Sequence, residues 1–238
     1  MQLDVMPGTF VRRYKRFFAD VVLEDGREIV AHCPNTGSMK TLLREGAPAF
    51  VTPNDDPKRK LKYTLTLLGL PRRKLAMVDT SLPNGLVADA ITAGRIPELG
   101  GYDGLRREVR YGSRNSRIDI VLDPAEGEDR TSCWVEVKNC TMASSTSPGR
   151  CDFPDAVTSR GLKHLEEMAD LAREGARVVQ FYLVSRTDCD RCGIASEIDP
   201  AYRDGLLAAR DAGVEVLCYR LAITRRKLTM GERCELEL

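Results

Sequence analysis

The sequence is poor in histidine, with only His32 and His164 among its 238 residues. A metal centre built mainly from imidazole ligands is therefore excluded. No apolar run approaches the roughly 18 residues that a membrane-spanning helix needs. The first residues, Met1 to Asp4, also lack the basic and apolar regions of a signal peptide. We therefore expect a cytoplasmic protein that does not bind membranes.

Disulfides are not expected either, although the chain has eight cysteines. Without an export signal, a chain of this size is expected in a reducing compartment, where thiols stay free. Cys189 and Cys192 have the spacing of metal ligands, but no second pair lies at the distance typical of a zinc ribbon. Two interpretations remain, a structural zinc and free thiols on a loop, and the second is favoured.

Composition fits a globular protein of two modest domains or one large one, with 42% apolar and 30% charged residues. The net charge of +1 alone says nothing about nucleic acid. Its distribution is more informative, because residues 1–80 hold 14 Lys and Arg against 9 Asp and Glu, and the remainder holds 22 against 26. A basic N-terminal part suggests contact with a polyanion.

Residues 9–79 have the pattern of β-structure alone. We expect a first strand that ends at residue 23 and four further strands at 28–32, 47–52, 61–67 and 74–79. Asp25-Gly26 is a strong signal for a hairpin turn between the first two. Five short strands without room for crossover helices predict a closed five-stranded barrel of the OB type.

Barrels of this type bind single-stranded nucleic acid through basic grooves and stacking aromatics. Two segments of the barrel offer that mixture. They comprise Arg12, Arg13, Tyr14, Lys15, Arg16 and Phe17, and Lys58, Arg59 and Lys60 with Tyr63. The alternative is a solvated basic edge strand that discourages aggregation.

The most informative stretch is a predicted β-hairpin with arms at 116–122 and 133–138. Asp119 lies between isoleucines and Glu136 between valines, where apolar side chains would be expected. Lys138 follows Glu136 by two residues, so both side chains share one face of the strand. A divalent cation would explain two carboxylates here, because it neutralises their repulsion. The alternative is an ordinary solvated strand face.

Between barrel and hairpin we expect a helix at 82–94, a glycine-rich break at 100–104 and a helix or strand at 105–111 that carries Glu108. This places a barrel domain at 1–80, a linker helix and loop at 81–104, and an α/β domain with a central mixed sheet at 105–238.

After the hairpin we expect a polar loop at 144–149 and then a helix with Pro154 in its first turn. Its predicted buried stripe consists of Val157, Gly161, Leu165, Met168 and Ala172. A buried strand at 177–184, a helix at 200–212 and a strand at 214–221 complete the domain.

The order of these elements resembles the core of the PD-(D/E)xK nuclease superfamily. The resemblance implies that Asp119 and Glu136 hold Mg²⁺ or Mn²⁺ and that Lys138 activates water. Glu108 would be an auxiliary acid of the catalytic group. Phosphate contacts would come from the following helix, through Arg160, Lys163 and His164. The literal Pro-Asp of the motif is absent, because Ile118 precedes Asp119.

Longer blocks resemble the sugar fermentation stimulation protein A family of bacteria and archaea. They are residues 12–17, 32–39, 108–112, 116–119, 135–138 and 153–165. The resemblance implies an OB-like N-terminal domain, a nuclease-like C-terminal domain, DNA binding without sequence preference and a role in regulating maltose metabolism. The Cys189/Cys192 pair is not part of that pattern.

Two functions therefore stay open: a non-enzymatic DNA-binding protein with a nuclease-like metal site, and a Mg²⁺-dependent nuclease that acts on DNA structures or ends. The family favours the first. The acidic residues favour the second, because a surface that only binds phosphates needs cations rather than acids. The sequence does not determine an oligomeric state.

Overall fold

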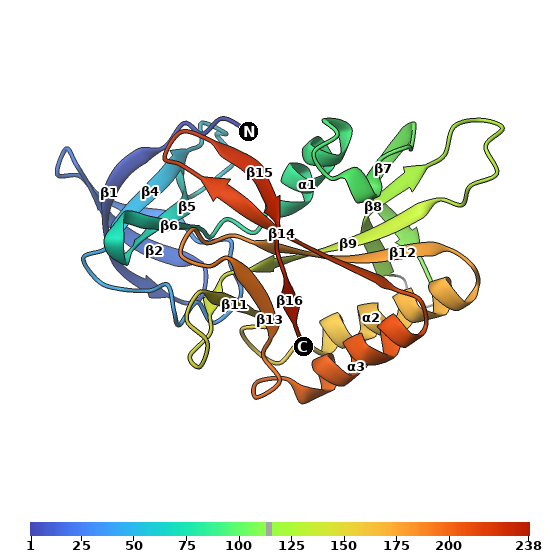
Figure 1. Ribbon diagram of the computed structural model, residues 1–238. Coiled ribbons are helices and arrows are strands. Elements are labelled where there is room, and N and C mark those ends of the chain that lie inside the picture. Colours follow the sequence, from blue (N-terminus) through green and yellow to red (C-terminus); the bar gives the residue numbers. More distant parts are fainter. Residues whose placement is uncertain (113–115) are drawn as a thin grey trace.

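The first five strands of the computed structural model, which describes residues 1–112 and 116–238, close into a barrel (Figure 1). They are β1 (Met6–Tyr14), β2 (Phe18–Leu23), β3 (Glu28–His32), β4 (Pro48–Pro53) and β5 (Tyr63–Leu70). They pair in the order β3-β2-β1-β4-β5, and His32 of β3 pairs with Thr64 of β5 to close the ring. The predicted five-stranded OB-like barrel is confirmed.

The boundaries of the strands nevertheless differ from the predicted ones. The segment expected to end at residue 23 is two strands, separated by a turn in which Lys15 and Arg16 have φ of 47° and 62°. Gly and Asn favour such positive φ angles, and neither occurs here, so the turn has no sequence signal. The predicted last strand becomes β6 (Lys74–Met77), which follows the 3-10 turn η1 (Pro71–Arg73) and pairs with β5 outside the ring.

The second half is built on a six-stranded mixed sheet with the order β15-β14-β12-β9-β8-β7. Its strands are β7 (Gly104–Tyr111), β8 (Ser116–Asp123), β9 (Cys133–Cys140), β12 (Arg177–Val184), β14 (Glu215–Ile223) and β15 (Leu228–Arg233). The central β9, β12 and β14 are parallel, and the outer pairs are antiparallel. This is the expected α/β domain with a central mixed sheet.

Helices cover both faces of this sheet (Figure 1). Helix α1 (Pro83–Thr92), followed by the 3-10 turn η2 (Pro97–Leu99), packs on one face, where Leu86 and Val87 join a core with Ile120 and Val135. Helices α2 (Ser159–Arg173) and α3 (Pro200–Asp211) cover the other face, where Leu165 joins a second core. None of the helices in the described part of the chain is both long and apolar enough to cross a membrane.

Helix α2 begins later than predicted. Thr158 is its N-cap, and its hydroxyl accepts a hydrogen bond from Gly161 N–H at 3.0 Å. Pro154 lies before the helix, in a cis peptide bond with Phe153. Val157 also lies outside the helix, where 75% of it is exposed, so its place in the buried stripe was wrong.

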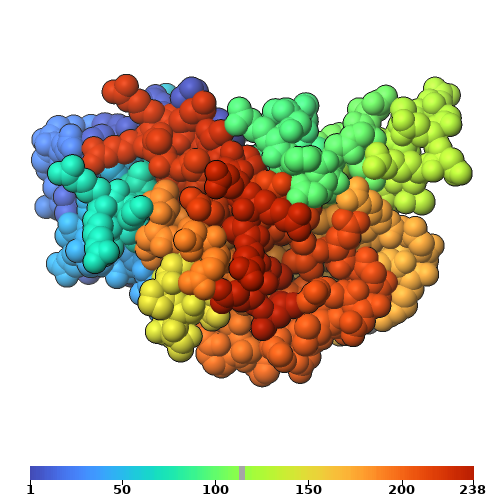
Figure 2. Space-filling model, in the orientation of Figure 1, coloured from blue at the N-terminus to red at the C-terminus, as the bar shows by residue number. Residues whose placement is uncertain are grey.

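Several short strands were not predicted. One small sheet consists of β10 (Met142–Ala143), β11 (Arg150–Phe153), β13 (Arg191–Ile194) and β16 (Leu236–Glu237). The last residues of the chain, in dark red, lie at the surface of the face shown in Figure 2. Cys192 is therefore part of a strand, whereas a loop was expected.

The barrel and the second half share a core. Phe50, Leu67 and Met77 of the barrel belong to the same buried cluster as α1 and the central sheet. Backbone hydrogen bonds reinforce the contact, for example from Met77 N–H to Ser185 C=O at 2.9 Å. Because apolar packing and backbone bonding both cross the junction, the barrel is fixed relative to the sheet.

Candidate metal and phosphate site

The candidate site lies where strands β8 and β9 separate. Their ladder has three pairs, from Leu122 and Cys133 to Ile120 and Val135, and is not continued to Asp119 and Glu136. The Asp119 carboxylate takes the place of a backbone partner, because its Oδ2 accepts the Val137 N–H at 2.7 Å. Because the two strands separate at this point, the Asp119 carboxylate lies next to the Glu136 carboxylate.

Helix α1 fixes the other oxygen of Asp119. The side-chain amide of Asn84 donates to Asp119 Oδ1 at 2.6 Å. Asn84 was not predicted as part of the site, because it lies 35 residues earlier and its only sequence context is an expected linker helix. The contact makes α1 a supporting element of the site.

Glu136 of β9 is almost fully buried, with 3% of its side chain exposed, and two groups share its Oε1 atom. Lys138 Nζ lies 2.6 Å away and His164 Nδ1 lies 2.5 Å away. The His164 Nε2 atom accepts a hydrogen bond from Arg160 at 3.4 Å. A neutral His164 that accepts through Nε2 must donate through Nδ1, so it acts as a donor to Glu136.

The placement of His164 corrects its predicted role. It was expected to contact DNA, but it is 5% exposed and its ring contacts Glu136. A buried ring in that position orients a carboxylate and cannot lie against a phosphate at the surface. Arg160 is exposed on α2, and Lys163 is half-buried on the same helix, so these two stay candidates for phosphate contact.

The two carboxyl groups differ in acidity. Burial, followed by the repulsion from Glu136, raises the pKa of Asp119 to about 6. Burial also acts to raise the pKa of Glu136, but the charge of Lys138 and the hydrogen bond from His164 outweigh it, so the pKa of Glu136 lies below its ordinary value. At neutral pH both groups are therefore mainly ionised, and the charge on Asp119 is the poorly compensated one.

A second buried carboxyl group was not assigned a role from the sequence. Glu167 of α2 accepts a hydrogen bond from the Ser116 hydroxyl through Oε2 at 2.5 Å. Glu167 Oε1, Glu136 Oε2 and the Tyr111 hydroxyl are buried without a hydrogen-bond partner among the described residues. Burial, followed by the charges of Glu136 and Glu167, raises the pKa of Tyr111. The site is therefore more acidic than the Asp119, Glu136 and Lys138 pattern predicted.

Glu108 lies close enough to Asp119 to add to its repulsion. It is an exposed residue of β7 with a φ of 55°, and its neighbours Arg107 and Val109 pair with Ile120 and Ile118 of β8. Positive φ in a strand is strained for a residue with a Cβ atom. The register of β7 and β8 places Glu108 opposite Asp119.

A divalent cation fits this group of atoms chemically. Glu136 Oε2 offers a buried oxygen without a partner, and Asp119 supplies a second carboxylate. Within residues 1–112 and 116–238, no three His, Cys, Asp or Glu side chains are grouped so that they could hold a metal ion. A cation here would therefore complete its shell with main-chain carbonyls, water or phosphate oxygens, as Mg²⁺ commonly does.

The predicted DNA-binding residues of the barrel fall into two groups. Arg13 is used by the fold, because its guanidinium donates to the carbonyls of Arg16, Asn35 and Gly37. Arg59 is half-buried and contacts Thr64 and His32. The other predicted residues are at or near the surface, namely Arg12, Tyr14, Lys15, Arg16, Lys58 and Lys60.

Among the barrel aromatics, Phe17 is the best placed for stacking. It is 43% exposed, and its ring stacks on His32 with the centroids 6.4 Å apart. Tyr14 instead stacks on Phe18 at 5.4 Å, and the Tyr63 hydroxyl accepts a hydrogen bond from Arg27. Phe17 also lies in the β1–β2 turn beside Lys15 and Arg16, so its ring and two cations share one turn.

A hollow of about 420 Å³ lies between the barrel and the nuclease-like site. Its lining includes Arg16 and Gly37 from the barrel and Asn139, Asp152 and Thr158 from the second half. Asn139 directly follows Lys138 on β9.

The fold and the site define a class: an OB-type barrel joined to a domain of the restriction-endonuclease type. Comparison with known proteins agrees with it. Residues 11–78 match the family model described as SfsA N-terminal OB domain, and residues 81–227 match the one described as Sugar fermentation stimulation protein RE domain. The chain belongs to the sugar fermentation stimulation protein family.

Individual relatives cover nearly the whole chain. It is 49% identical to the sugar fermentation stimulation protein homolog of Jannaschia sp. (strain CCS1), over 95% of this chain and 92% of that protein. It is 46% identical to the homolog of Maricaulis maris (strain MCS10), over 99% and 97%. The structure of Pyrococcus furiosus SfsA in complex with Ca²⁺ superimposes with a TM-score of 0.87 at 25% identity, over 100% of this chain and 98% of that one.

Proposed function

We propose that this protein binds DNA without sequence preference and holds a divalent cation, Mg²⁺ or Mn²⁺, at Asp119 and Glu136. The observation that carries the proposal is the pair of carboxylates at the opening between β8 and β9, Glu136 buried and Asp119 half-buried. Buried like charges repel each other, and a cation between them removes that cost. The Ca²⁺ complex of the Pyrococcus furiosus relative supports a divalent cation in this family.

The residues of this chain would divide the work at such a site. Asp119 and Glu136 would hold the cation, which when bound supplies positive charge for a DNA phosphate. Asn84 and Val137 N–H hold Asp119 in place, and His164 holds Glu136. Arg160 is exposed one turn before His164, where it would meet the same phosphate. Glu108 would add a further oxygen from β7.

The barrel would supply most of the affinity for DNA. The exposed Lys15 and Arg16 lie in the β1–β2 turn, and the exposed Lys58 and Lys60 lie in the β4–β5 loop. Lysine and arginine that neutralise phosphates release counterions, which favours binding to any sequence. Phe17 adds a ring on which a base could stack. A role in sugar metabolism follows from the family name alone, and the DNA-binding proposal does not depend on it.

Phosphodiester hydrolysis is the second candidate, and the position of Lys138 favours it. Its side chain is only 14% exposed, and its ammonium nitrogen lies 2.6 Å from Glu136 Oε1. A surface that only reads phosphates has no need of a lysine held against a buried carboxylate. In a nuclease, that lysine would hold or deprotonate the attacking water and stabilise charge on the phosphate.

Both candidates are tested with labelled single- and double-stranded DNA of several sequences in Mg²⁺, Mn²⁺ or EDTA. Binding measured by fluorescence anisotropy should be independent of sequence and stronger with metal. Equal affinity with metal and with EDTA would contradict the role of the cation. Cleavage that requires metal and disappears in Lys138→Ala would establish the nuclease, whereas intact DNA after prolonged incubation leaves binding alone.

A further inference from the structure

Six of the eight cysteines gather at one end of the second half of the chain. Sulfur contacts join them into two groups. One comprises Cys140, Cys192, Cys218 and Cys234, and the other comprises Cys151 and Cys189. The remaining two, Cys33 and Cys133, are buried elsewhere. All are free thiols, and the site at Asp119 and Glu136 uses none of them.

One pair in this cluster is much closer than the others. The Sγ atoms of Cys218 and Cys234 are 3.0 Å apart, whereas those of Cys140 and Cys192 are 3.7 Å apart. The backbone matches this proximity, because Tyr219 pairs with Arg233 across β14 and β15 and Cys234 N–H donates to Cys218 C=O at 2.9 Å. Opposed residues of antiparallel strands have Cα atoms about 4.5–5.5 Å apart, which lies within the range of about 4.4–6.8 Å found in disulfides.

The same pair can be reached from solvent. Cys218 and Cys234 both line a surface hollow of about 850 Å³ between α3, β14 and the C-terminal residues. Cys234 is partly exposed, whereas Cys218 is buried. Hydrogen bonds with Cys192 and Cys234, together with burial, raise the pKa of Cys218. Cys234 is therefore the thiol that a reagent would meet first.

We propose that Cys218 and Cys234 are a redox-modification site. The two cysteines form a reversible disulfide with each other by exchange with a low-molecular-weight disulfide such as oxidised glutathione. The Cys234 thiolate attacks one glutathione sulfur, which forms a mixed disulfide and releases one glutathione thiolate. Cys218 then attacks Cys234 Sγ and releases the second glutathione, which takes up the Cys218 proton. Two protein thiols are oxidised and one glutathione disulfide is reduced to two glutathione molecules.

The bond would act on the C-terminal segment. Residues after Cys234 form the two-residue strand β16, which pairs with Cys192 and Gly193 of β13. Glu237 of β16 also forms ion pairs with Arg150 and Arg191. Oxidation would therefore attach a short and weakly paired segment covalently to β14 of the central sheet.

The test equilibrates the folded protein in glutathione buffers of increasing oxidised fraction, blocks free thiols, and maps the products by mass spectrometry. The expected product has lost two hydrogen atoms and contains a peptide crosslinked between Cys218 and Cys234. Because the bond restricts the unfolded chain, the melting temperature should rise by roughly 5–10 °C, and the rise should reverse with reductant.

Variants test the order of attack. Cys218→Ser should accumulate one glutathione on Cys234, and Cys234→Ser should leave Cys218 unmodified. Cys133→Ser, which changes a buried thiol outside the cluster, should still form the disulfide. Wild-type protein that stays fully reduced in the most oxidising buffer would overturn the proposal. A bond between other cysteines, or a metal ion on these thiols after purification, would also overturn it, and both outcomes are read without any variant.

Discussion

Asp119 Oδ2 accepts the backbone N–H of Val137 at 2.7 Å, so a side chain of β8 occupies the place where a β8 backbone partner would otherwise lie. The ladder between the two strands ends one pair earlier, at Ile120 and Val135. The opening places a second carboxylate, Glu136, beside the first.

Metal binding should stabilise the protein through Asp119. A ligand that binds only the folded state raises the free energy of unfolding by about 2.7 kcal/mol at 100 times its Kd. For a chain of this size that is roughly 5–10 °C in melting temperature. We expect such a rise with Mn²⁺ in wild type and none in Asp119→Asn, measured by calorimetry.

Asp123→Asn is the matched control. Asp123 is on the same strand but pairs with Arg106 at the surface, so this variant should keep the full response to Mn²⁺. An equal rise in melting temperature with Mn²⁺ in wild type and Asp119→Asn would show that Asp119 does not bind the metal.

The metal-free protein should lose stability as the pH rises through the pKa of Asp119. Burial and Glu136 raise that pKa from 3.8 to about 6, so between these values the folded state binds more protons than the unfolded state. The protonated carboxyl therefore stabilises the fold below about pH 4, and this contribution is lost toward pH 6. The loss corresponds to on the order of 3 kcal/mol.

The contribution of Asp119 is isolated by subtraction. Urea denaturation in EDTA should show wild type and Asp119→Asn with similar stability at pH 4 and the variant more stable at pH 7. Stability curves that stay parallel between pH 4 and pH 7 would mean that Asp119 is not strained by burial.

Lys138 and the cation should compensate for each other at Glu136. Replacing Lys138 by Ala leaves a buried carboxylate without its ion-pair partner, a change that typically costs about 3–5 kcal/mol. Mn²⁺ should restore part of that loss, so we expect a larger metal-induced rise in melting temperature in Lys138→Ala than in wild type. Lys138→Arg keeps the charge and should behave like wild type. A rise of the same size in all three proteins would show that Lys138 and the metal do not share Glu136.

The acidic pattern was predictable because its signal is local. Asp119 and Glu136 interrupt apolar strands, and the period of two places Lys138 beside Glu136. The roles of Asn84 and His164 could not be predicted, because each depends on how a helix packs against the sheet. Similarly, Arg13 in the sequence resembles its exposed neighbours, and only the folded loop shows that it holds the carbonyls of Asn35 and Gly37.

DNA binding should depend on charge at one end of the barrel. Lys58 and Lys60 precede β5, whereas Arg72 and Arg73 follow it, so the two pairs lie at opposite ends of that strand. Reversing Lys58 and Lys60 to Glu should weaken binding to every sequence alike. If both contact phosphates of duplex DNA, the slope of log K against log salt should fall by roughly 2.

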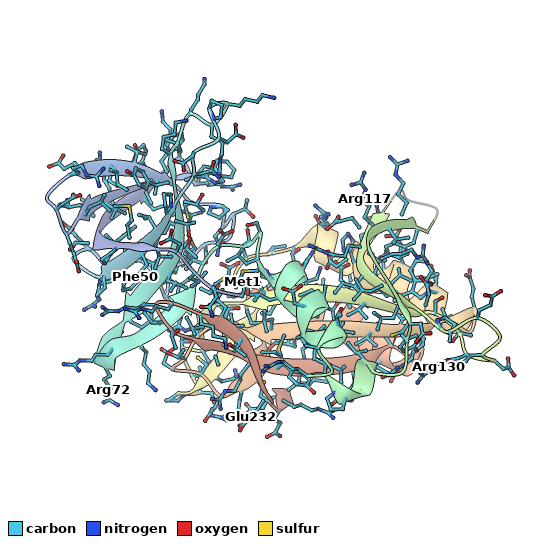
Figure 3. All side chains as sticks on the ribbon, turned by 90° about the horizontal axis from the view of Figure 1, so that it is seen from above. Met1, Phe50, Arg72, Arg117, Arg130 and Glu232 are labelled. Atoms are coloured by element: carbon cyan, nitrogen blue, oxygen red, sulfur yellow. The ribbon has the colours of Figure 1, made fainter. Side chains whose placement is uncertain are left out.

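The same reversal of Arg72 and Arg73 is the control. Figure 3 shows that Arg72 points outward from the barrel, far from Arg117 of β8. Arg72 and Arg73 are both exposed. This variant should keep its salt slope and nearly all of its affinity. Equal losses in the two double variants would indicate that only net charge matters and that the barrel has no preferred DNA-binding surface.

Phe17 should contribute to single-stranded DNA binding as a stacking ring. Its side chain is 43% exposed and lies in the turn with Lys15 and Arg16, so a base beside those cations can reach it. Stacking on an aromatic side chain contributes about 1–3 kcal/mol per base. Phe17→Ala should therefore weaken single-strand binding roughly tenfold, with a smaller effect on duplex DNA, whose bases are already stacked.

Phe17→Leu separates stacking from simple apolar contact. Leucine keeps an apolar side chain of similar length but has no ring, so a stacking role predicts that both variants bind weakly. Anisotropy titrations, with the folded fraction checked by the melting temperature, measure the difference. If Phe17→Leu binds as tightly as wild type, contact is apolar and not stacking. If both variants lose stability but keep their affinity per folded molecule, Phe17 serves the barrel through its ring contact with His32.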